Sequence, residues 1–169
     1  MKTNIDISAI IVYYEKYLHD DVTELHYAYK SSLETTKLNY EFVYVVDGEL
    51  PDVIQKLNDL WGQGEKIKVI KLGKWFGDAT ALQVGFEHSS GQLIITLPSY
   101  KQVTESDIPK LVSAVETKDM VVAWRYPRLD GFLNSFQSSV FNRLIKWIVG
   151  SNFHDLKCNV KVFRREVLE

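Results

Sequence analysis

Residues 40–61, YEFVYVVDGELPDVIQKLNDLW, point to the fold class of this chain. The first seven residues are rich in β-branched and aromatic side chains, which favour a buried strand. Asp47 and Gly48 then supply a turn, and Pro51 and Asp52 suit the first turn of a helix. The apolar residues that follow recur near helical spacing, at Val53, Ile54, Leu57, Leu60 and Trp61. The segment therefore predicts a strand, a turn and a helix in succession.

The same alternation extends to both sides of this segment. Further strands are expected at residues 5–13, 67–72, 92–97 and 120–124. Further helices are expected at residues 22–35, with Asp20 or Asp21 as the N-cap, at 78–88, and after Ser106 or Asp107. Strands that alternate with helices predict an α/β fold of three layers, in which a mainly parallel sheet has helices on both faces. Ligands of such sheets bind beyond the C-terminal ends of the strands.

The composition is that of an ordinary globular protein. The chain has 169 residues, 46% hydrophobic and 25% charged, which suits one domain. A net charge of −2 predicts no nucleic-acid partner and requires any anion site to be local. No apolar stretch is long enough to span a bilayer and no signal peptide is evident, so we expect a cytoplasmic protein. The single Cys158 excludes an intrachain disulfide and is expected to be buried.

The C-terminal third carries an amphipathic pattern. Phe132, Phe136, Val140, Leu144 and Ile148 follow one another at i,i+4 steps, which predicts a helix. This helix either docks on the sheet or lies on a membrane or a partner. Because the chain stops directly after a strand-like segment, residues 1–169 are interpreted as a single domain that is truncated at its C-terminus.

Three motifs occur in the order seen in a known family. Residues 11–15, IVYYE, take the place of P-V-Y-N-E, and residues 46–49, VDGE, take the place of D-D-G-S. Residues 74–82, KWFGDATAL, match R-N-F-G-K-E-A-A-L and are followed by Gly85 and Gly91 at the family's intervals. The last match is the most specific, because a strand, the Phe-Gly pair, a helix and two spaced glycines coincide.

Two further segments extend the match to nearly the whole chain. Residues 123–128, AWRYPR, are similar to a phosphate-binding G-x-R-x-x-R segment, and residues 158–165, CNVKVFRR, match G-x-F-R-L-x-x-R more loosely. The chain therefore resembles the family 2 glycosyltransferases, which have the GT-A (nucleotide-diphospho-sugar transferase-like) fold. Within them it resembles the polyprenyl-phosphate sugar transferases, such as dolichyl-phosphate mannose synthase.

The resemblance implies a UDP- or GDP-linked nucleotide sugar as a ligand. The residues that it assigns to this ligand are Tyr13, Glu15, Asp47, Lys74 and Gln102. It also implies that Arg125 and Arg128 bind the phosphate of a polyprenyl-phosphate acceptor, where two guanidinium groups three residues apart could form bidentate bonds.

The residues themselves leave other roles open. Asp47 could bond its own backbone in an Asx turn, and the two arginines could pair with surface carboxylates such as Asp130. Lys74 replaces an arginine and lacks its bidentate fork. Trp75 replaces the motif's asparagine, and it would either crowd the pocket or pack on the sheet edge.

The main departure from the family follows the fourth predicted strand. The family has D-x-D and then L-Q-D there, and their two aspartates and glutamine hold a divalent cation, whereas this chain reads Pro98-Ser99-Tyr100 and then Lys101-Gln102-Val103. Mg²⁺ or Mn²⁺ is the family's expected cofactor, yet its ligands are missing here. Pro98 offers no side-chain donor, Tyr100 offers a neutral phenol, and Gln102 alone cannot hold the cation. Metal-dependent transfer is therefore expected to be weak or lost, unless Lys101 supplies a fixed positive charge.

Two functions remain open from the sequence. The first is a glycosyltransferase domain that recognises a nucleotide sugar and a phosphorylated acceptor, in the cytoplasm or at the cytoplasmic face of a membrane. The second is a non-catalytic binding or scaffold module that partners an enzyme of polysaccharide or glycolipid assembly. The second is favoured by the joint loss of both metal carboxylates, the first acid of D-D-G-S and the asparagine of P-V-Y-N-E.

Overall fold

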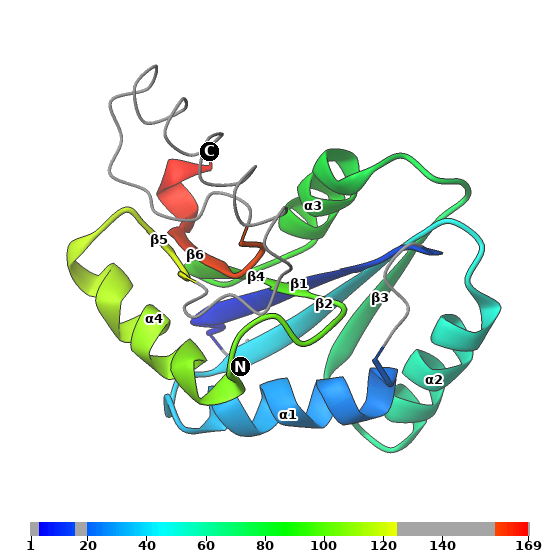
Figure 1. Cartoon of the computed structure of the whole chain (residues 1–169), viewed down its shortest axis with the longest axis horizontal. Helices are drawn as coiled ribbons and strands as arrows, with labels where there is room; N and C mark the ends of the chain where they lie inside the picture. The colour runs from blue at the N-terminus through cyan, green and yellow to red at the C-terminus, as the bar shows by residue number, and fades with distance from the viewer. Residues whose placement is uncertain (1–3, 16–19, 125–157, 169) are drawn as a thin grey trace, which may run out of the picture.

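A computed structural model describes residues 4–15, 20–124 and 158–168. The strands are β1 (Ile7–Tyr13), β2 (Tyr40–Asp47), β3 (Ile67–Leu72), β4 (Leu93–Pro98), β5 (Met120–Val122) and β6 (Lys161–Arg164). The helices are α1 (Val22–Glu34), α2 (Pro51–Gly62), α3 (Asp78–Glu87) and α4 (Ile108–Ala114). Helices α1, α2 and α4 cover one face of the sheet, and α3 lies on the other (Figure 1). The predicted α/β architecture is confirmed.

The six strands form one mixed sheet in the order β3-β2-β1-β4-β6-β5. β1 pairs in parallel with β2 and β4, and β2 pairs in parallel with β3. β6 is antiparallel to both β4 and β5. The sheet is thus mainly parallel, as predicted, but β5 does not lie beside β4. The C-terminal strand β6 separates them, and the local pattern of the chain did not indicate this insertion.

Period-two alternation sorts the strand side chains between two cores. Ile7, Ala9, Ile11 and Tyr13 of β1 are buried in the larger core, under α1, α2 and α4. Ile10 of the same strand packs on the side of α3. α3 can approach closely because it carries Gly85, where an added Cβ would lie 2.5 Å from Ile10 Cγ2. Cys158 is fully buried in the larger core, as expected.

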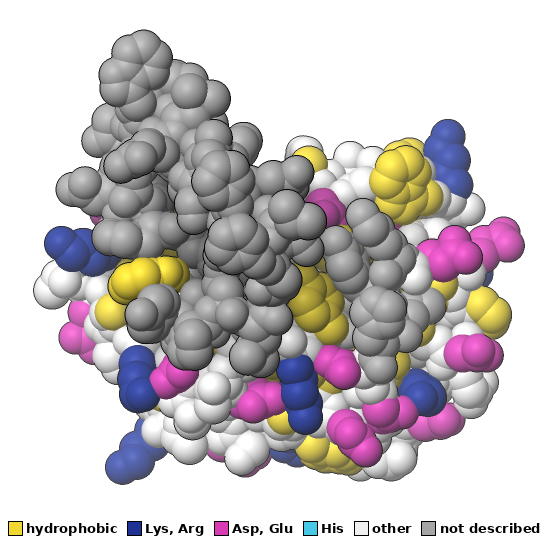
Figure 2. All heavy atoms as spheres, viewed as in Figure 1, with side chains coloured by type: hydrophobic (Ala, Val, Ile, Leu, Met, Phe, Trp, Pro, Cys, Tyr) yellow, Lys and Arg dark blue, Asp and Glu magenta, His cyan; other side chains and the backbone are white. Residues whose placement is uncertain are grey.

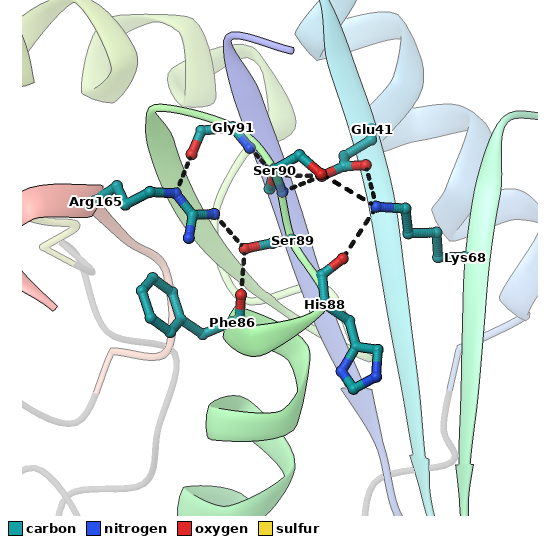
Figure 3. Close-up of polar contacts among 9 residues, drawn as sticks. Glu41, Lys68, Phe86, His88, Ser89, Ser90, Gly91 and Arg165 are labelled. Carbon is teal, nitrogen blue, oxygen red and sulfur yellow. Dashed lines mark hydrogen bonds and ion pairs between the residues drawn. The ribbon is translucent and has the colours of Figure 1, made fainter. Parts of the chain in front are cut away.

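The α3 face of β2 carries a carboxylate at each end. At the N-terminal end, the buried Glu41 accepts hydrogen bonds from Ser8 Oγ at 2.7 Å and from Ser90 N at 2.6 Å, and it pairs with Lys68 Nζ at 2.8 Å (Figure 3). Burial raises the pKa of Glu41, but the bonds from Lys68, Ser8 and Ser90 outweigh it and hold the pKa below its ordinary value. Glu41 thereby ties the turn after α3 to β1 and β3, and Asp47, at the other end, binds the segment before α3.

The turn after α3 is also bound from the C-terminal part of the chain. Arg165 Nε donates to the carbonyl oxygen of Gly91 at 2.7 Å, and its guanidinium lies 4.7 Å from the centroid of the Phe86 ring (Figure 3). Gly91 N donates to Ser8 Oγ at 2.8 Å. These contacts join α3, β1 and the segment after β6 at the N-terminal ends of β1 and β4. This is the end of the sheet opposite the predicted ligand site.

A buried histidine links α1 to β2. His26 Nδ1 lies 2.8 Å from Tyr44 Oη, and Nε2 lies 3.2 Å from Glu65 Oε2. Lys30 Nζ donates to the same carboxylate at 2.6 and 2.9 Å. Burial lowers the pKa of His26, and although Glu65 opposes this, the net shift is downward.

We expect the free energy of unfolding to decrease as the pH falls from about 7 to about 5. The unfolded histidine binds its proton near its ordinary pKa of 6.5, whereas the folded one binds it only at lower pH, so acid favours the unfolded chain. Urea unfolding across this range measures the loss, and His26→Gln should reduce it. The exposed His88 provides the control substitution, His88→Gln. Equal pH slopes in wild type and His26→Gln would contradict the prediction.

Some predicted features lie outside the described residues. These are Arg125, Arg128 and the amphipathic segment 132–149. In the ranges that the structure describes, no helix is both long enough and apolar enough to cross a membrane. Acidic and basic side chains are interspersed over the described part of the face seen in Figure 2, as the near-zero net charge leads one to expect.

Candidate functional site at the C-terminal ends of the parallel strands

The C-terminal ends of β1, β2 and β3 border a cavity of about 510 Å³. Glu15 follows β1, Asp47 ends β2 and Lys74 follows β3, and all three line this cavity. The connections β2–α2 and β3–α3, at the right of Figure 1, supply the rest of the wall. These further lining residues are Gly48, Glu49, Leu50, Pro51, Asp52, Val53, Gly73 and Trp75. The structure thus brings together three of the residues that the sequence assigned to a nucleotide sugar.

Asp47 is a buried anchor at the base of this cavity. Its Oδ1 accepts a hydrogen bond from Phe76 N, and its Oδ2 accepts one from Gly77 N, both at 2.8 Å. Only 2% of the residue is exposed. Both oxygens therefore accept hydrogen bonds from the backbone of the β3–α3 connection. They do not form the Asx turn that the sequence left open for Asp47. Gly77 adopts φ of 92°, a conformation that side-chain-bearing residues rarely take, so the connection follows a path that glycine permits.

The charges around the cavity are mostly negative. Glu15, Asp47, Glu49 and Asp52 contribute carboxylates, and Lys74 is the lysine among the lining residues. Lys74 Nζ lies 5.2 Å from the centroid of the Phe76 ring, within cation–π range. Carboxylates accept hydrogen bonds from hydroxyl and N–H groups but repel phosphates. The lining therefore suits a ligand portion that is rich in hydrogen-bond donors.

Two predicted residues lie away from this cavity. Tyr13 is 1% exposed in the larger core, with its ring centroid 6.1 Å from that of Tyr44. Burial, and then the charges of Asp21 and Asp20, raise the pKa of the Tyr13 hydroxyl. Strand alternation could have placed Tyr13 there, because Ile7, Ala9 and Ile11 share its face.

Gln102 joins two backbone segments instead of lining the cavity. Its Oε1 accepts a hydrogen bond from Asn159 N at 2.8 Å, and its Nε2 donates to Tyr100 Oη at 3.0 Å. It thereby connects the loop after β4 to the residues that enter β6. The sequence offers no local signal for this bridge, because the two segments lie 57 residues apart.

Of the two expectations for Trp75, the structure excludes packing on the sheet edge. The side chain is 71% exposed, so it does not pack on the sheet edge. It lines the cavity without filling it, because a cavity of about 510 Å³ remains beside it. Its indole lies beside Gly77, one of the two residues that donate to Asp47, because an added Cβ at Gly77 would be 4.0 Å from Trp75 Cζ2.

A second cavity, of about 340 Å³, lies on the α3 face beside the end of β4. Its described lining is largely apolar and includes Ile10, Leu82, Phe86 and Phe163. The polar residues at this cavity that the sequence did not predict as ligand-binding include Tyr14, Asp78, Asn159 and Lys161. Tyr14 Oη donates to Asp78 Oδ2 at 3.4 Å. Alternation along β1 could have indicated Tyr14, because it follows Ile10 and Val12 on this face.

Pro98, Ser99 and Tyr100 also line the second cavity, at the place of the family's D-x-D motif. Tyr29 Oη donates to the carbonyl oxygen of Pro98 at 2.9 Å, so the side chain of Tyr29 on α1 holds the end of β4. None of the three side chains is a carboxylate. Among the described residues, no group of three or more His, Cys, Asp or Glu side chains could hold a metal ion. The described donor set therefore does not fit the family's Mg²⁺ or Mn²⁺.

The mainly parallel sheet with helices on both faces and a cavity at its strand ends defines an α/β domain with a ligand site at the carboxyl ends of the strands. Residues 8–169 match the family described as Glycosyl transferase family 2, and the chain belongs to that family.

Two curated relatives illustrate the branch to which the chain is similar. The dodecaprenyl-phosphate galacturonate synthase of Rhizobium johnstonii is 32% identical over 134 residues, which cover 77% of this chain and 40% of that protein. The undecaprenyl-phosphate 4-deoxy-4-formamido-L-arabinose transferase of Klebsiella pneumoniae is 29% identical over 165 residues, which cover 96% and 50%. The chain thus spans about half the length of the curated relatives it matches.

Solved structures with the same fold have lower sequence identity. Glucosyl-3-phosphoglycerate synthase from Mycobacterium tuberculosis, in complex with Mn²⁺, UDP and phosphoglyceric acid, gives a TM-score of 0.73 at 13% identity, covering 97% of this chain and 57% of that one. A mannosyltransferase from Pyrobaculum calidifontis, in complex with GDP-Man and Mn²⁺, gives 0.63 at 14% identity, covering 99% and 46%. At these identities the likeness shows the fold.

Proposed function

We propose that this chain is the donor-binding part of a family 2 glycosyltransferase and that it holds a UDP- or GDP-linked sugar in the cavity at the ends of β1, β2 and β3. The observation that carries the proposal is the convergence of Glu15, Asp47 and Lys74, from three separate strand ends, around one cavity. Asp47 acts there through the β3–α3 connection, and Glu15 and Lys74 are open to contact the ligand.

The proposed acceptor is a polyprenyl phosphate, as the names of the curated relatives suggest. The apolar lining of the second cavity, beside the end of β4, supports an acceptor with a hydrocarbon chain. Arg125 and Arg128 remain the residues proposed for its phosphate. Such an acceptor would place the whole protein at the cytoplasmic face of a membrane.

The proposed transfer is a displacement at the anomeric carbon of the sugar. An acceptor oxygen forms a bond to that carbon, the bond from the carbon to the diphosphate breaks, and the nucleoside diphosphate leaves with the electron pair. Charge develops on the departing diphosphate and must be stabilised. The residues in place of D-x-D supply no anionic metal ligand, so a fixed cation such as Lys101 would have to act. Turnover is accordingly expected to be slow or absent.

A non-catalytic binding or scaffold module is the second candidate, and one observation favours it. Pro98, Ser99 and Tyr100 replace the metal carboxylates, and the nearby Gln102 is engaged in a bridge to Asn159. In that case the fold would serve to bind a ligand or an enzyme of polysaccharide or glycolipid assembly, without transferring sugar.

Calorimetric titration with UDP and with GDP tests the proposal. We expect at least one nucleotide to bind with a Kd that is the same with and without Mn²⁺, because Pro98, Ser99 and Tyr100 supply no carboxylate in place of the family's metal ligands. Binding that requires Mn²⁺ would contradict this prediction and direct attention to ligands outside the described ranges. Folded protein that binds neither nucleotide would overturn the donor site and favour the non-catalytic module.

A further inference from the structure

Trp75 is a large aromatic surface beside a cavity whose lining combines carboxylates with apolar side chains. It is 71% exposed, although a side chain of this size is normally mostly buried. Its neighbour Phe76 is 49% exposed, but Lys74 Nζ is positioned over the Phe76 ring. Trp75 therefore offers the larger and more open aromatic surface of this connection.

The backbone on the C-terminal side of Trp75 is firmly held. The two peptide N–H groups that follow it, those of Phe76 and Gly77, both donate to the buried Asp47 carboxylate. Because α3 begins at Asp78, directly after these anchored groups, the indole projects from a short and fixed connection. A ligand that stacks on it would bind a preorganised surface, which lowers the entropic cost of binding.

The charges select which part of a nucleotide sugar would lie here. Glu15, Glu49 and Asp52 present carboxylates to the same cavity. They accept hydrogen bonds from base N–H groups and ribose hydroxyls, whereas they repel the diphosphate. A flat ring with N–H donors on its edge matches an indole face that is bordered by carboxylates.

We infer that Trp75 is the platform on which the nucleobase stacks and that Asp47 is the positioning residue that holds this platform. The inference rests on the proposed donor site and adds a residue that contacts the base. Base–aromatic stacking is sequence-tolerant because every base has a π-face, so the platform suits both uracil and guanine.

Substitution of Trp75 tests the inference. Trp75→Ala should weaken the binding of UDP and GDP by about 5-fold to about 150-fold, the range that base–aromatic stacking gives on alanine substitution. Trp75→Phe, which keeps an aromatic face, should recover most of the affinity. Trp61 is the matched control, because it is 69% exposed and lies near the C-terminal end of α2, away from the cavity-lining first turn of that helix. Trp61→Ala should bind both nucleotides like wild type.

Tryptophan fluorescence provides a second readout. Nucleotide should change the emission of wild type and of Trp61→Phe, and this change should be lost in Trp75→Phe. Wild-type affinity in Trp75→Ala would overturn the platform while leaving the donor site intact. Failure of folded wild-type protein to bind UDP or GDP would overturn both together.

Discussion

We expect Asp47→Ala to lose binding of UDP and GDP, with Kd values raised more than about tenfold, and to lower the free energy of unfolding by about 2–5 kcal/mol. The substitution removes the acceptor of two backbone N–H groups in a site that is 2% exposed. Hydrogen bonds to charged groups contribute about 1.5–3 kcal/mol each, and the freed N–H groups would have to find water. The connection that carries Lys74 and Trp75 would then lose its fixed path.

Two variants separate anchoring from charge. Asp52 lines the same cavity and is exposed, so Asp52→Ala removes a carboxylate without freeing the β3–α3 connection. We expect its stability to remain within about 0.5 kcal/mol of wild type. Asp47→Asn keeps the shape but turns an NH₂ group toward one of the N–H donors, so it should resemble Asp47→Ala. Urea unfolding together with calorimetry measures both effects. An Asp47→Ala protein as stable as wild type would refute the anchoring role.

The second large effect is expected from Gly91→Ala, which should lower the free energy of unfolding by about 3 kcal/mol or more. A Cβ on Gly91 would lie 2.5 Å from Ser8 N and 2.7 Å from Ile7 C, both backbone atoms of β1. β1 is hydrogen-bonded on both sides, to β2 and to β4, so its backbone cannot move away alone. Relief of the clash would also disturb the bonds from Gly91 N to Ser8 and from Arg165 to the Gly91 carbonyl.

Gly62→Ala is the matched control for this substitution. Gly62 ends α2, and an added Cβ there would meet nothing within 4 Å. Because alanine has the higher helix propensity, Gly62→Ala should be neutral or slightly stabilising. Chemical denaturation of both variants measures their free energies of unfolding. Equal stability of Gly91→Ala and Gly62→Ala would contradict the prediction, because it would show that the turn before β4 can move to accommodate the added Cβ.

Local pattern predicted most of the elements because their causes are local. The strand bounds of β3 agree with the expectation, and those of β1, β2, β4 and β5 differ by one or two residues. Of the two predicted N-cap candidates, Asp20 and Asp21, it is Asp21 that caps α1. Its side chain accepts hydrogen bonds from Thr23 N and Glu24 N. Capping, helical spacing and strand alternation all act over a few residues, so the sequence of a segment contains the information that they require.

The structure places the predicted site residues in different surroundings, and one cause accounts for the difference. Glu15, Asp47 and Lys74 were expected together because parallel strands end at a common edge. Motif position assigned Tyr13 to the ligand, but its place in the alternation of β1 puts it in the core. Gln102 was assigned by motif as well, yet it bonds a backbone group 57 residues away. A motif gives the residue type at a strand end. The groups that this side chain contacts, however, come from other parts of the chain and are not contained in the motif.

The order of residues was sufficient for the α/β class, for the parallel run of β1 to β4 and for the edge of the sheet where a ligand would bind. Hydrophobic periodicity and turn chemistry act within each segment. In this chain both of them indicate the same alternation of strands and helices. Three features depended on contacts between distant segments: the antiparallel insertion of β6 beside β4, the capture of the β3–α3 connection by Asp47, and the meeting of the β2–α2 and β3–α3 connections around the cavity that Trp75 lines. Each requires two parts of the chain to meet in space, and hydrogen-bond geometry and close packing select such pairings only when the whole domain is assembled.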